Sequence, residues 1–185
     1  LVEMAEFVLK NNFFEFETKI IQQLSGTAIG SKFAPPYACL FMDKMENDFL
    51  EQEVVKPWLW LRYIDDVFFI WTESEKKLEG FMSRLNNFHP NINFTHEKSP
   101  SFVNFLDVSV KKVDNRLETD LYCKPTDCHQ FLHFNSTHPF HIKKSIVYSQ
   151  GLRIKRLCSS PLIFQKNLQN LRTCFYKRKT KLLFC

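Results

Sequence analysis

The chain has 185 residues, of which 44% are hydrophobic, and this is enough apolar material to build a folded body with a buried core. No apolar run reaches the ~20 residues of a membrane span, and the six cysteines lack the regular spacing of a secreted disulfide scaffold. We therefore exclude a disordered chain and a membrane partner, and we expect a soluble intracellular protein with reduced thiols.

The first part of the chain predicts helices that alternate with short extended segments. An amphipathic pattern over residues 2–9 indicates a helix already in progress, so we expect the chain to be part of a longer protein. Residues 13–20 predict an extended segment or hairpin, and residues 24–31, with two of the four glycines, predict a loop. A helical pattern then runs from about Pro35 to Leu50, where the prolines suit a first turn.

Residues 58–71 form an apolar run rich in aromatic and β-branched residues, with Asp65 and Asp66 at its centre. Two adjacent acids in the middle of a buried strand would be costly, because like charges repel and lose hydration there. The run therefore predicts a β-hairpin with both acids at its tip. A further helix is predicted to begin at Ser74, as N-cap, and to run through about Asn87.

The second part of the chain predicts a small antiparallel sheet followed by two basic helices. Strand-like runs occupy residues 92–96, 103–113 and 117–123, and Asp114-Asn115 suits a tight turn between the last two. Helical patterns after residue 141 are separated at Ser159-Ser160-Pro161. The stretch from Arg153 to Lys181 holds nine Lys or Arg and no Asp or Glu, which suits a polyanionic partner.

Asp65 and Asp66 are also candidate metal ligands. Adjacent side chains diverge at a turn, so one carboxylate can bind a divalent cation while its neighbour supports or shares the site. Two-metal phosphoryl transfer uses such carboxylates to hold Mg²⁺ ions. An exposed Asp-Asp turn is common in proteins of every kind, so the dipeptide alone favours an ordinary turn.

The residues around the two acids resemble motifs of reverse transcriptases. Residues 62–68, RYIDDVF, resemble the Tyr-x-Asp-Asp motif, and residues 23–35, QLSGTAIGSKFAP, are similar to the glycine-rich motif that precedes it in these polymerases. The detail resembles most the enzymes of Penelope-like retroelements, which are relatives of telomerase. Their downstream palm and thumb motifs are similar to NFLD at 104–107, LYCKPTD at 121–127, STHP at 136–139 and YSQGLR at 148–153.

The resemblance covers nearly the whole chain and implies an α+β fold. Residues 1–124 would form part of a right-hand polymerase palm, an antiparallel sheet with helices on one face. Residues 125–185 would form the palm-to-thumb connection and a mostly helical, basic thumb. The fingers and the upstream palm strand would lie outside this chain.

The resemblance also implies roles for individual residues. Asp65 and Asp66 would be the catalytic pair that binds Mg²⁺, with two ions in the complete enzyme. The other implied residues are Gln23, Gly26, Gly30 and Tyr63 in the nucleotide and template pocket, Phe105, Leu106 and Asp107 at the primer grip, and Arg153 and Arg156 on the nucleic-acid backbone. The implied partners are an RNA template, a DNA primer and dNTPs, and the implied location is the nucleus.

Three features depart from the family pattern. Ile29 stands where many relatives have methionine, and Cys39 stands where asparagine is expected. Family polymerases also supply a metal-binding aspartate from a strand upstream of the glycine-rich loop, whereas no aspartate occurs before Asp43. We therefore expect RNA-directed DNA polymerase activity in a longer parent protein and none from this chain alone.

Two other hypotheses stay open. One is a non-catalytic retroelement remnant whose basic helices bind RNA or DNA through phosphate contacts. The other is a zinc site, for which chemically suitable ligands are Cys123, Cys128, His129, His133, His138 and His141. Their spacing matches no tight paired-ligand pattern, so we interpret them as packing or nucleic-acid contacts.

Overall fold

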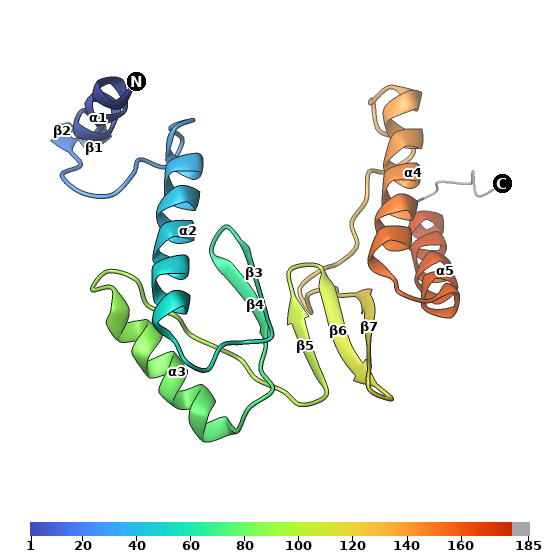
Figure 1. The fold of residues 1–185 in the computed structure, drawn as a ribbon. Helices are drawn as coiled ribbons and strands as arrows, with labels where there is room; N and C mark the ends of the chain where they lie inside the picture. Colours follow the sequence, from blue (N-terminus) through green and yellow to red (C-terminus); the bar gives the residue numbers. More distant parts are fainter. Residues whose placement is uncertain (179–185) are drawn as a thin grey trace. The chain divides into compact units, whose positions relative to one another are not determined.

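The computed structural model describes residues 1–178 and has an α+β architecture, which confirms the predicted class (Figure 1). The chain divides into two compact units, Leu1–Thr95 and His96–Cys185, so the predicted palm boundary at residue 124 falls inside the second unit and stays a prediction. The described strands form three separate antiparallel sheets, two of two strands and one of three. Across residues 1–178, no helix combines the length and the apolar character needed to cross a bilayer.

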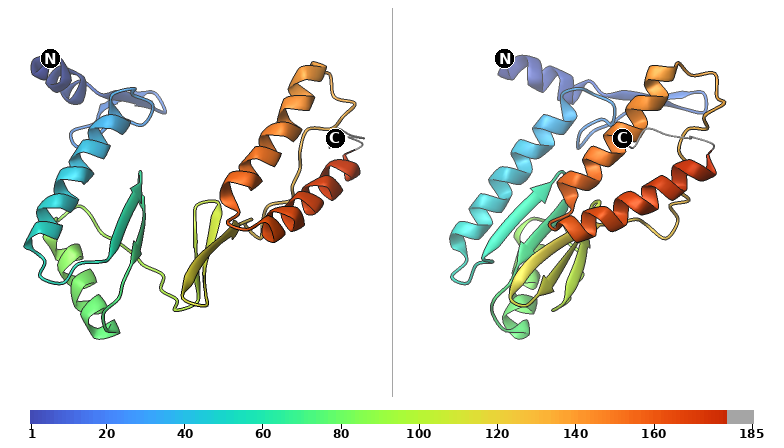
Figure 2. Two further views of the ribbon diagram at one scale, coloured as in Figure 1. Left: turned by 45° about the vertical axis from the view of Figure 1, so that its right-hand side comes forward. Right: turned by 90° about the vertical axis from the view of Figure 1, so that its right-hand side faces the viewer.

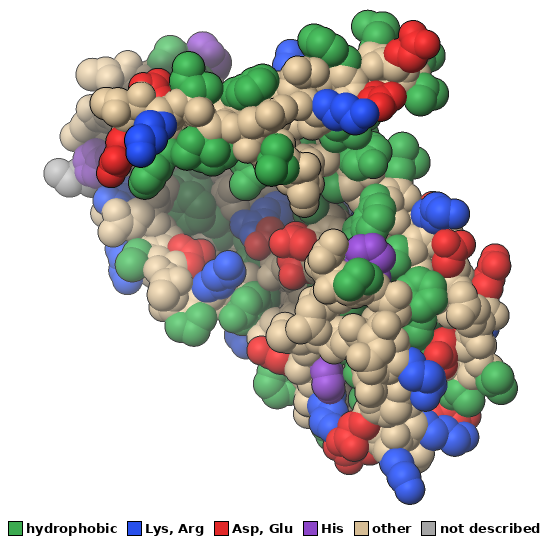
Figure 3. Space-filling view, turned by 90° about the vertical axis from the view of Figure 1, so that its left-hand side faces the viewer, with side chains coloured by type: hydrophobic (Ala, Val, Ile, Leu, Met, Phe, Trp, Pro, Cys, Tyr) green, Lys and Arg blue, Asp and Glu red, His purple; other side chains and the backbone are tan. Residues whose placement is uncertain are grey.

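The elements predicted for the first unit are confirmed, apart from its last strand. They are α1 (Val2–Lys10), β1 (Phe13–Phe16), β2 (Lys19–Gln22), α2 (Ala34–Gln52), β3 (Leu59–Tyr63), β4 (Asp66–Ile70) and α3 (Glu75–Phe88). Helix α1 has no buried side chain, and both faces of the β1–β2 hairpin are exposed. Hydrophobic side chains accordingly lie at the surface among charged ones (Figure 3).

The core of the first unit lies where α2 and α3 cover one face of the β3–β4 hairpin (Figure 2). Side chains alternate between faces along a strand, so Trp60 and Arg62 of β3 point to the same side, toward the helices. Trp60 and its cross-strand partner Phe69 stack with ring centroids 5.5 Å apart. The buried side chains beneath them are Phe49, Leu78, Phe81, Met82 and Leu85.

The predicted strand at residues 92–96 is wrong. This segment is irregular because one side chain replaces the strand partner that it would need. The Nδ2 of Asn86 donates to the carbonyl oxygen of Phe94 at 3.0 Å, and the Phe94 N–H donates to Asn86 Oδ1 at 2.6 Å. Both backbone groups of Phe94 are thereby satisfied while its ring packs against the core.

The second unit contains β5 (Phe102–Phe105), β6 (Val108–Val113), β7 (Arg116–Leu121), α4 (Phe140–Leu157) and α5 (Pro161–Lys177). The run predicted as one strand over residues 103–113 is two strands, because the chain turns at Leu106-Asp107 and Leu106 has a positive φ of 52°. The predicted tight turn at Asp114-Asn115 is confirmed, with φ values of 44° and 64°.

The two basic helices pack together and dock on the edge strand β7 (Figure 2). Their shared core consists of Val147, Ile154, Leu171 and Phe175. Ser159, in the short link between the helices, donates its N–H to the Thr119 carbonyl at 3.1 Å, and its Oγ accepts the Thr119 N–H at 3.0 Å. An edge strand with unpaired backbone groups invites association, and this link covers that position.

Asp120 of β7 completes the attachment of the helices. Its Oδ1 accepts from Asn167 of α5 at 2.7 Å, and its Oδ2 pairs with Lys111 of β6 at 3.2 Å. Burial alone would raise the pKa of Asp120, but the hydrogen bonds from Asn167 and Lys111 outweigh it and leave the pKa below its usual value. The charged form of Asp120 therefore stabilises the folded unit.

We predict that Asp120→Asn lowers the free energy of unfolding at neutral pH and reduces its dependence on acid. Since the folded-state pKa lies below the ordinary value of 3.8, the carboxylate contributes fully above pH 3.8, and this contribution is lost as the pH falls through the lowered pKa. Between about pH 5 and about pH 2, the unchanged chain should lose more stability than the variant in thermal unfolding followed by circular dichroism. Asp114→Asn, in the exposed turn, is the control, and equal behaviour of both variants would contradict the prediction.

Candidate functional site

The β3–β4 hairpin presents Asp65 and Asp66 at its tip, as predicted. Tyr63 pairs with Asp66, so Ile64 and Asp65 form the two-residue loop, and all four side chains are exposed. Ile64 has a positive φ of 56°. A β-branched residue in this conformation is strained by about 1–3 kcal/mol and persists only where its surroundings hold it there, a situation that is common at functional sites.

Arg62 holds the strained tip against helix α2. Its Nε donates to Glu46 Oε2 at 2.8 Å, one Nη donates to the Ile64 carbonyl at 3.2 Å, and the other donates to the Cys39 carbonyl at 3.2 Å. The Arg62 and Glu46 side chains are only 12% and 8% exposed. The hydrogen bond to Glu46 raises the pKa of Arg62 against the opposing effect of burial, so the guanidinium keeps its charge.

The two aspartates suit a magnesium ion chemically, but they supply only part of a two-ion site. Carboxylate oxygens are the hard ligands that Mg²⁺ prefers. No third acidic, histidine or cysteine side chain gathers with Asp65 and Asp66 anywhere in residues 1–178. A complete pair of ions needs further oxygen ligands, so Asp65 and Asp66 would hold one part of such a centre.

The loop before α2 requires glycine at two of the predicted pocket positions. Gly26 and Gly30 have φ values of 80° and 97°, a region that is unfavourable for residues with a Cβ atom. Gln23 is tied locally, because its Nε2 donates to the Ser25 carbonyl at 2.9 Å. The glycines are thus explained by backbone conformation, while the nucleotide-pocket role of Gln23, Gly26, Gly30 and Tyr63 stays a prediction.

In the second unit, the predicted primer-grip turn lines a cavity of about 440 Å³. The cavity lies between this turn, the connection that follows β7, and faces of α4 and α5. Asp107 pairs there with Arg153 of α4, with 2.6 Å between Oδ2 and Nη2. The structure thus joins two residues predicted for separate roles. Phe105 ends β5, Leu106 lines the cavity, and Arg156 is exposed on α4, so their predicted roles stay untested.

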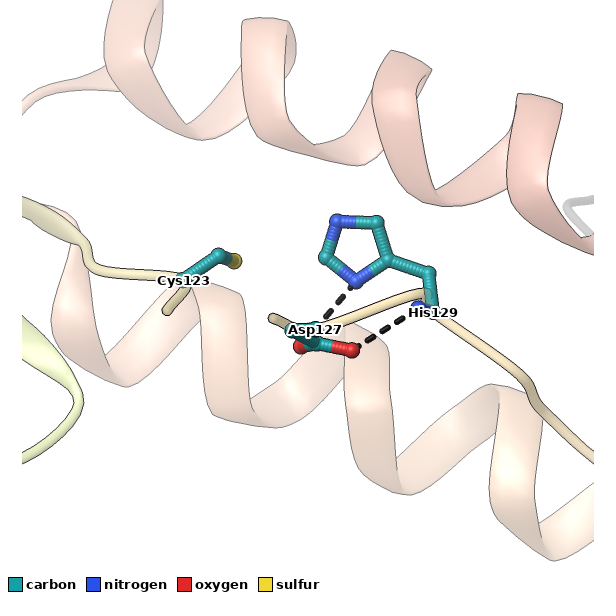
Figure 4. Close-up of side chains that lie close together, drawn as sticks. All are labelled: Cys123, Asp127 and His129. Atoms are coloured by element: carbon teal, nitrogen blue, oxygen red, sulfur yellow. Dashed lines mark hydrogen bonds and ion pairs between the residues drawn. The ribbon is translucent and has the colours of Figure 1, made fainter. Parts of the chain in front are cut away.

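Cys123, Asp127 and His129 gather in the wall of the same cavity (Figure 4). Each offers one ligand atom, and these atoms all lie within 4.8 Å of one another. Burial raises the pKa of the Cys123 thiol, and the nearby Asp127 carboxylate raises it further. The free thiol is therefore a poor nucleophile, because the thiolate is the reactive form.

The gathered residues match the zinc ligands considered in the sequence only in part, since Cys123 and His129 belong to both sets and Asp127 does not. The thiol of Cys128 points to the Thr126 carbonyl at 3.7 Å, and His133 Nδ1 accepts the Asn135 N–H at 3.2 Å. Neither joins the described cluster, whereas Asp127, which was considered only as part of a motif, does. The turn that brings Asp127 beside His129 carries no periodic signal that sequence reasoning could have used.

Comparison with known proteins gives one match, on the C-terminal helices. A family model described as an animal helix-turn-helix domain matches residues 130–179, which are 50 of the 185 residues and include α4 and α5. No curated protein and no solved structure matches the chain. The match agrees with the observed pair of packed helices joined by a short link.

We predict that Arg62→Met destabilises the first unit by about 3–5 kcal/mol, because it leaves the Glu46 carboxylate buried without its partner. The double variant Arg62→Met/Glu46→Leu should recover most of that loss, since it removes both charges. Denaturant unfolding measures the three free energies. Lys77→Met, which breaks the exposed pair with Glu73, is the matched control and should cost less than about 1 kcal/mol. A double variant as unstable as the single one would contradict the proposed cause.

Proposed function

We propose that this chain is part of an RNA-directed DNA polymerase in which Asp65 and Asp66 are the metal-binding carboxylates at the palm. The observation that carries the proposal is the hairpin tip, where a Tyr-Ile-Asp-Asp sequence forms a strained, exposed turn anchored by a half-buried arginine. An ordinary surface turn needs no such anchor. The proposal extends to an RNA template, a DNA primer, dNTPs and a nuclear location.

The residues of the tip have separable tasks in this proposal. Asp65 and Asp66 would hold Mg²⁺ ions, whose contribution when bound would be to activate the 3′-hydroxyl of the primer and to stabilise the departing pyrophosphate. Arg62 fixes the position of the turn relative to α2 through its hydrogen bonds to Glu46 and to the Ile64 carbonyl. Tyr63 lies opposite Asp66 in the strand register, where its exposed ring can pack beside the primer end.

A second candidate function, nucleic-acid binding without chemistry, is favoured by the helical pair. The helix-turn-helix match covers α4 and α5, and helix pairs of that class bind DNA. Residues 128–185 contain 11 Lys or Arg and no Asp or Glu, whereas residues 1–127 contain 14 basic and 20 acidic residues. A polymerase also needs a basic surface for its template and primer, so nucleic-acid binding is expected under both proposals. Only primer extension distinguishes them.

Primer extension tests the polymerase proposal. The chain should be compared with a version extended upstream to include the missing aspartate strand, and with that extended version carrying Asp65→Asn and Asp66→Asn. We expect Mg²⁺-dependent extension of a primed RNA template by the extended protein only. Each aspartate replacement should lower the rate at least about 1,000-fold, because several kcal/mol of charge stabilisation is lost and ~1.4 kcal/mol corresponds to a factor of ten.

The control for this experiment is Asp48→Asn, which changes an exposed carboxylate of α2 that pairs with Lys44 at the surface. It should leave primer extension unchanged. Inactivity of every version, together with retained nucleic-acid binding, would favour the non-catalytic candidate. Activity that survives replacement of both tip aspartates would refute their assignment as metal ligands.

Salt dependence tests the helical pair. Lys155 and Arg156 are exposed on α4 and form no described ion pair with another side chain in residues 1–178. Replacing each with glutamine should weaken binding to duplexes of any sequence. It should also make the fall of log K with log salt less steep, by about one unit of slope. Fluorescence anisotropy at several salt concentrations measures both quantities. Lys112→Gln, exposed on β6, is the matched control, and an equal change in its slope would contradict a role for α4.

A further inference from the structure

We propose that Cys123, Asp127 and His129 form a zinc-binding site in the wall of the second unit's cavity, separate from the magnesium carboxylates of the hairpin tip. The three side chains come from the irregular connection between β7 and α4 (Figure 4). This inference does not depend on polymerase activity. The segment between β7 and α4 would thus bind a zinc ion.

The distances suit a tetrahedral ion after a small closure. Zinc bonds of ~2.0–2.3 Å at tetrahedral angles place ligand atoms about 3.3–3.8 Å apart. The three ligand atoms lie within 4.8 Å of one another, so a shift of about 1 Å brings them to that spacing. Cys123 is exposed, so its side chain can rotate toward the other two ligands, and the adjacent cavity leaves room for water as the fourth ligand.

The backbone holds Asp127 and His129 together without any regular secondary structure. Asp127 Oδ1 accepts the His129 N–H at 2.7 Å, and its Oδ2 lies 3.2 Å from His129 Nδ1. The Asp127 N–H donates to the Lys124 carbonyl at 2.9 Å, which closes a turn. His129 has a positive φ of 49°, a conformation that is uncommon outside glycine and often marks functional positions.

His129 is also fixed from its other side. Its ring lies parallel to Phe131, at 6.5 Å between centroids and 3° between planes. Phe131 in turn stacks at 4.6 Å on Phe175, which is only 2% exposed in the core of the helical pair. The imidazole is therefore held in place by packed rings before any metal binds. A histidine without such contacts would lose more rotamer entropy on binding a metal.

The types of ligand atom select zinc over magnesium. A cysteine sulfur is a soft ligand that favours Zn²⁺, whereas Mg²⁺ takes oxygen ligands in near-octahedral geometry. Of the nearby carboxylates, Asp107 is paired with Arg153 and Asp120 with Lys111, whereas Asp127 belongs to the cluster itself.

Metal stoichiometry of the full chain tests the proposal. Protein treated with chelator and then dialysed against equimolar zinc should retain one zinc ion per chain by elemental analysis. Cobalt substitution should give the charge-transfer absorption that a thiolate ligand produces. Cys123→Ser should abolish that absorption, and Cys123→Ser and His129→Gln should each weaken zinc binding by more than the ~10–100-fold that changes to outer-shell partners cost.

The chain offers matched controls for both ligand types. Cys128→Ser and His133→Ala change the same residue types a few positions away, outside the cluster, and should keep zinc and the cobalt spectrum. Asp65→Asn/Asp66→Asn should also keep them, so failure of the polymerase proposal leaves this result intact. Circular dichroism of the metal-free proteins identifies a variant that has lost its fold. If a ligand variant is unfolded, the zinc affinity of the conservative variant Asp127→Asn is compared with that of the unchanged chain instead.

Three results would overturn the site. They are a folded, unchanged chain that retains no zinc, a Cys123→Ser chain that retains it with full affinity, and a Cys128→Ser chain that loses it as completely as Cys123→Ser. The last result would mean that zinc needs Cys128 as well, as in the wider set considered from the sequence, and that the three gathered residues are not the site.

Discussion

The part-buried contact between Arg62 and the buried Glu46 is the constraint on which the first unit depends. It connects the hairpin to α2 and, through the same guanidinium, fixes the carbonyl of a residue in the turn. Burying an ion pair contributes little net stability, because both charges lose hydration. Here Glu46 Oε1 is also buried without a hydrogen-bond partner among the described residues. The pair instead fixes the position of the hairpin tip relative to helix α2. Apolar side chains would fix this position less precisely, because their contacts have little directional preference.

The second unit fixes its helices with hydrogen bonds to β7. Its helices could slide along β7 if only Val147, Ile154, Leu171 and Phe175 held them, since apolar contacts have little directional preference. Ser159 removes this freedom by engaging both backbone groups of Thr119. In both units, then, the hydrophobic core supplies most of the favourable free energy, and a small number of directional contacts at the periphery decides the arrangement.

Local patterns in the sequence were sufficient for most of the fold. The hairpin at 58–71 was predictable because two acids interrupt an apolar run, and the break before α5 was predictable because Ser160 and Pro161 suit a helix start. Contacts between distant residues were not predictable in this way. Asn86 satisfies the backbone of Phe94 and so abolishes a strand, and Leu106 adopts a conformation that its side chain disfavours. For the candidate site, the sequence predicted the exposed acids, but Glu46 lies 16 residues from Arg62 and carries no mark of its partnership.

The uneven distribution of charge along the chain bears on how a partner is first met. The last 58 residues carry eleven positive charges and no negative one, while the preceding 127 carry a net charge of −6, from 14 basic and 20 acidic side chains. A polyanion that diffuses toward the protein is therefore drawn to one stretch and repelled by the rest. Such steering selects an orientation before any short-range contact forms, and it weakens as salt shortens the screening length toward about 8 Å. The distribution of charge along the chain thus affects the association rate as well as the affinity.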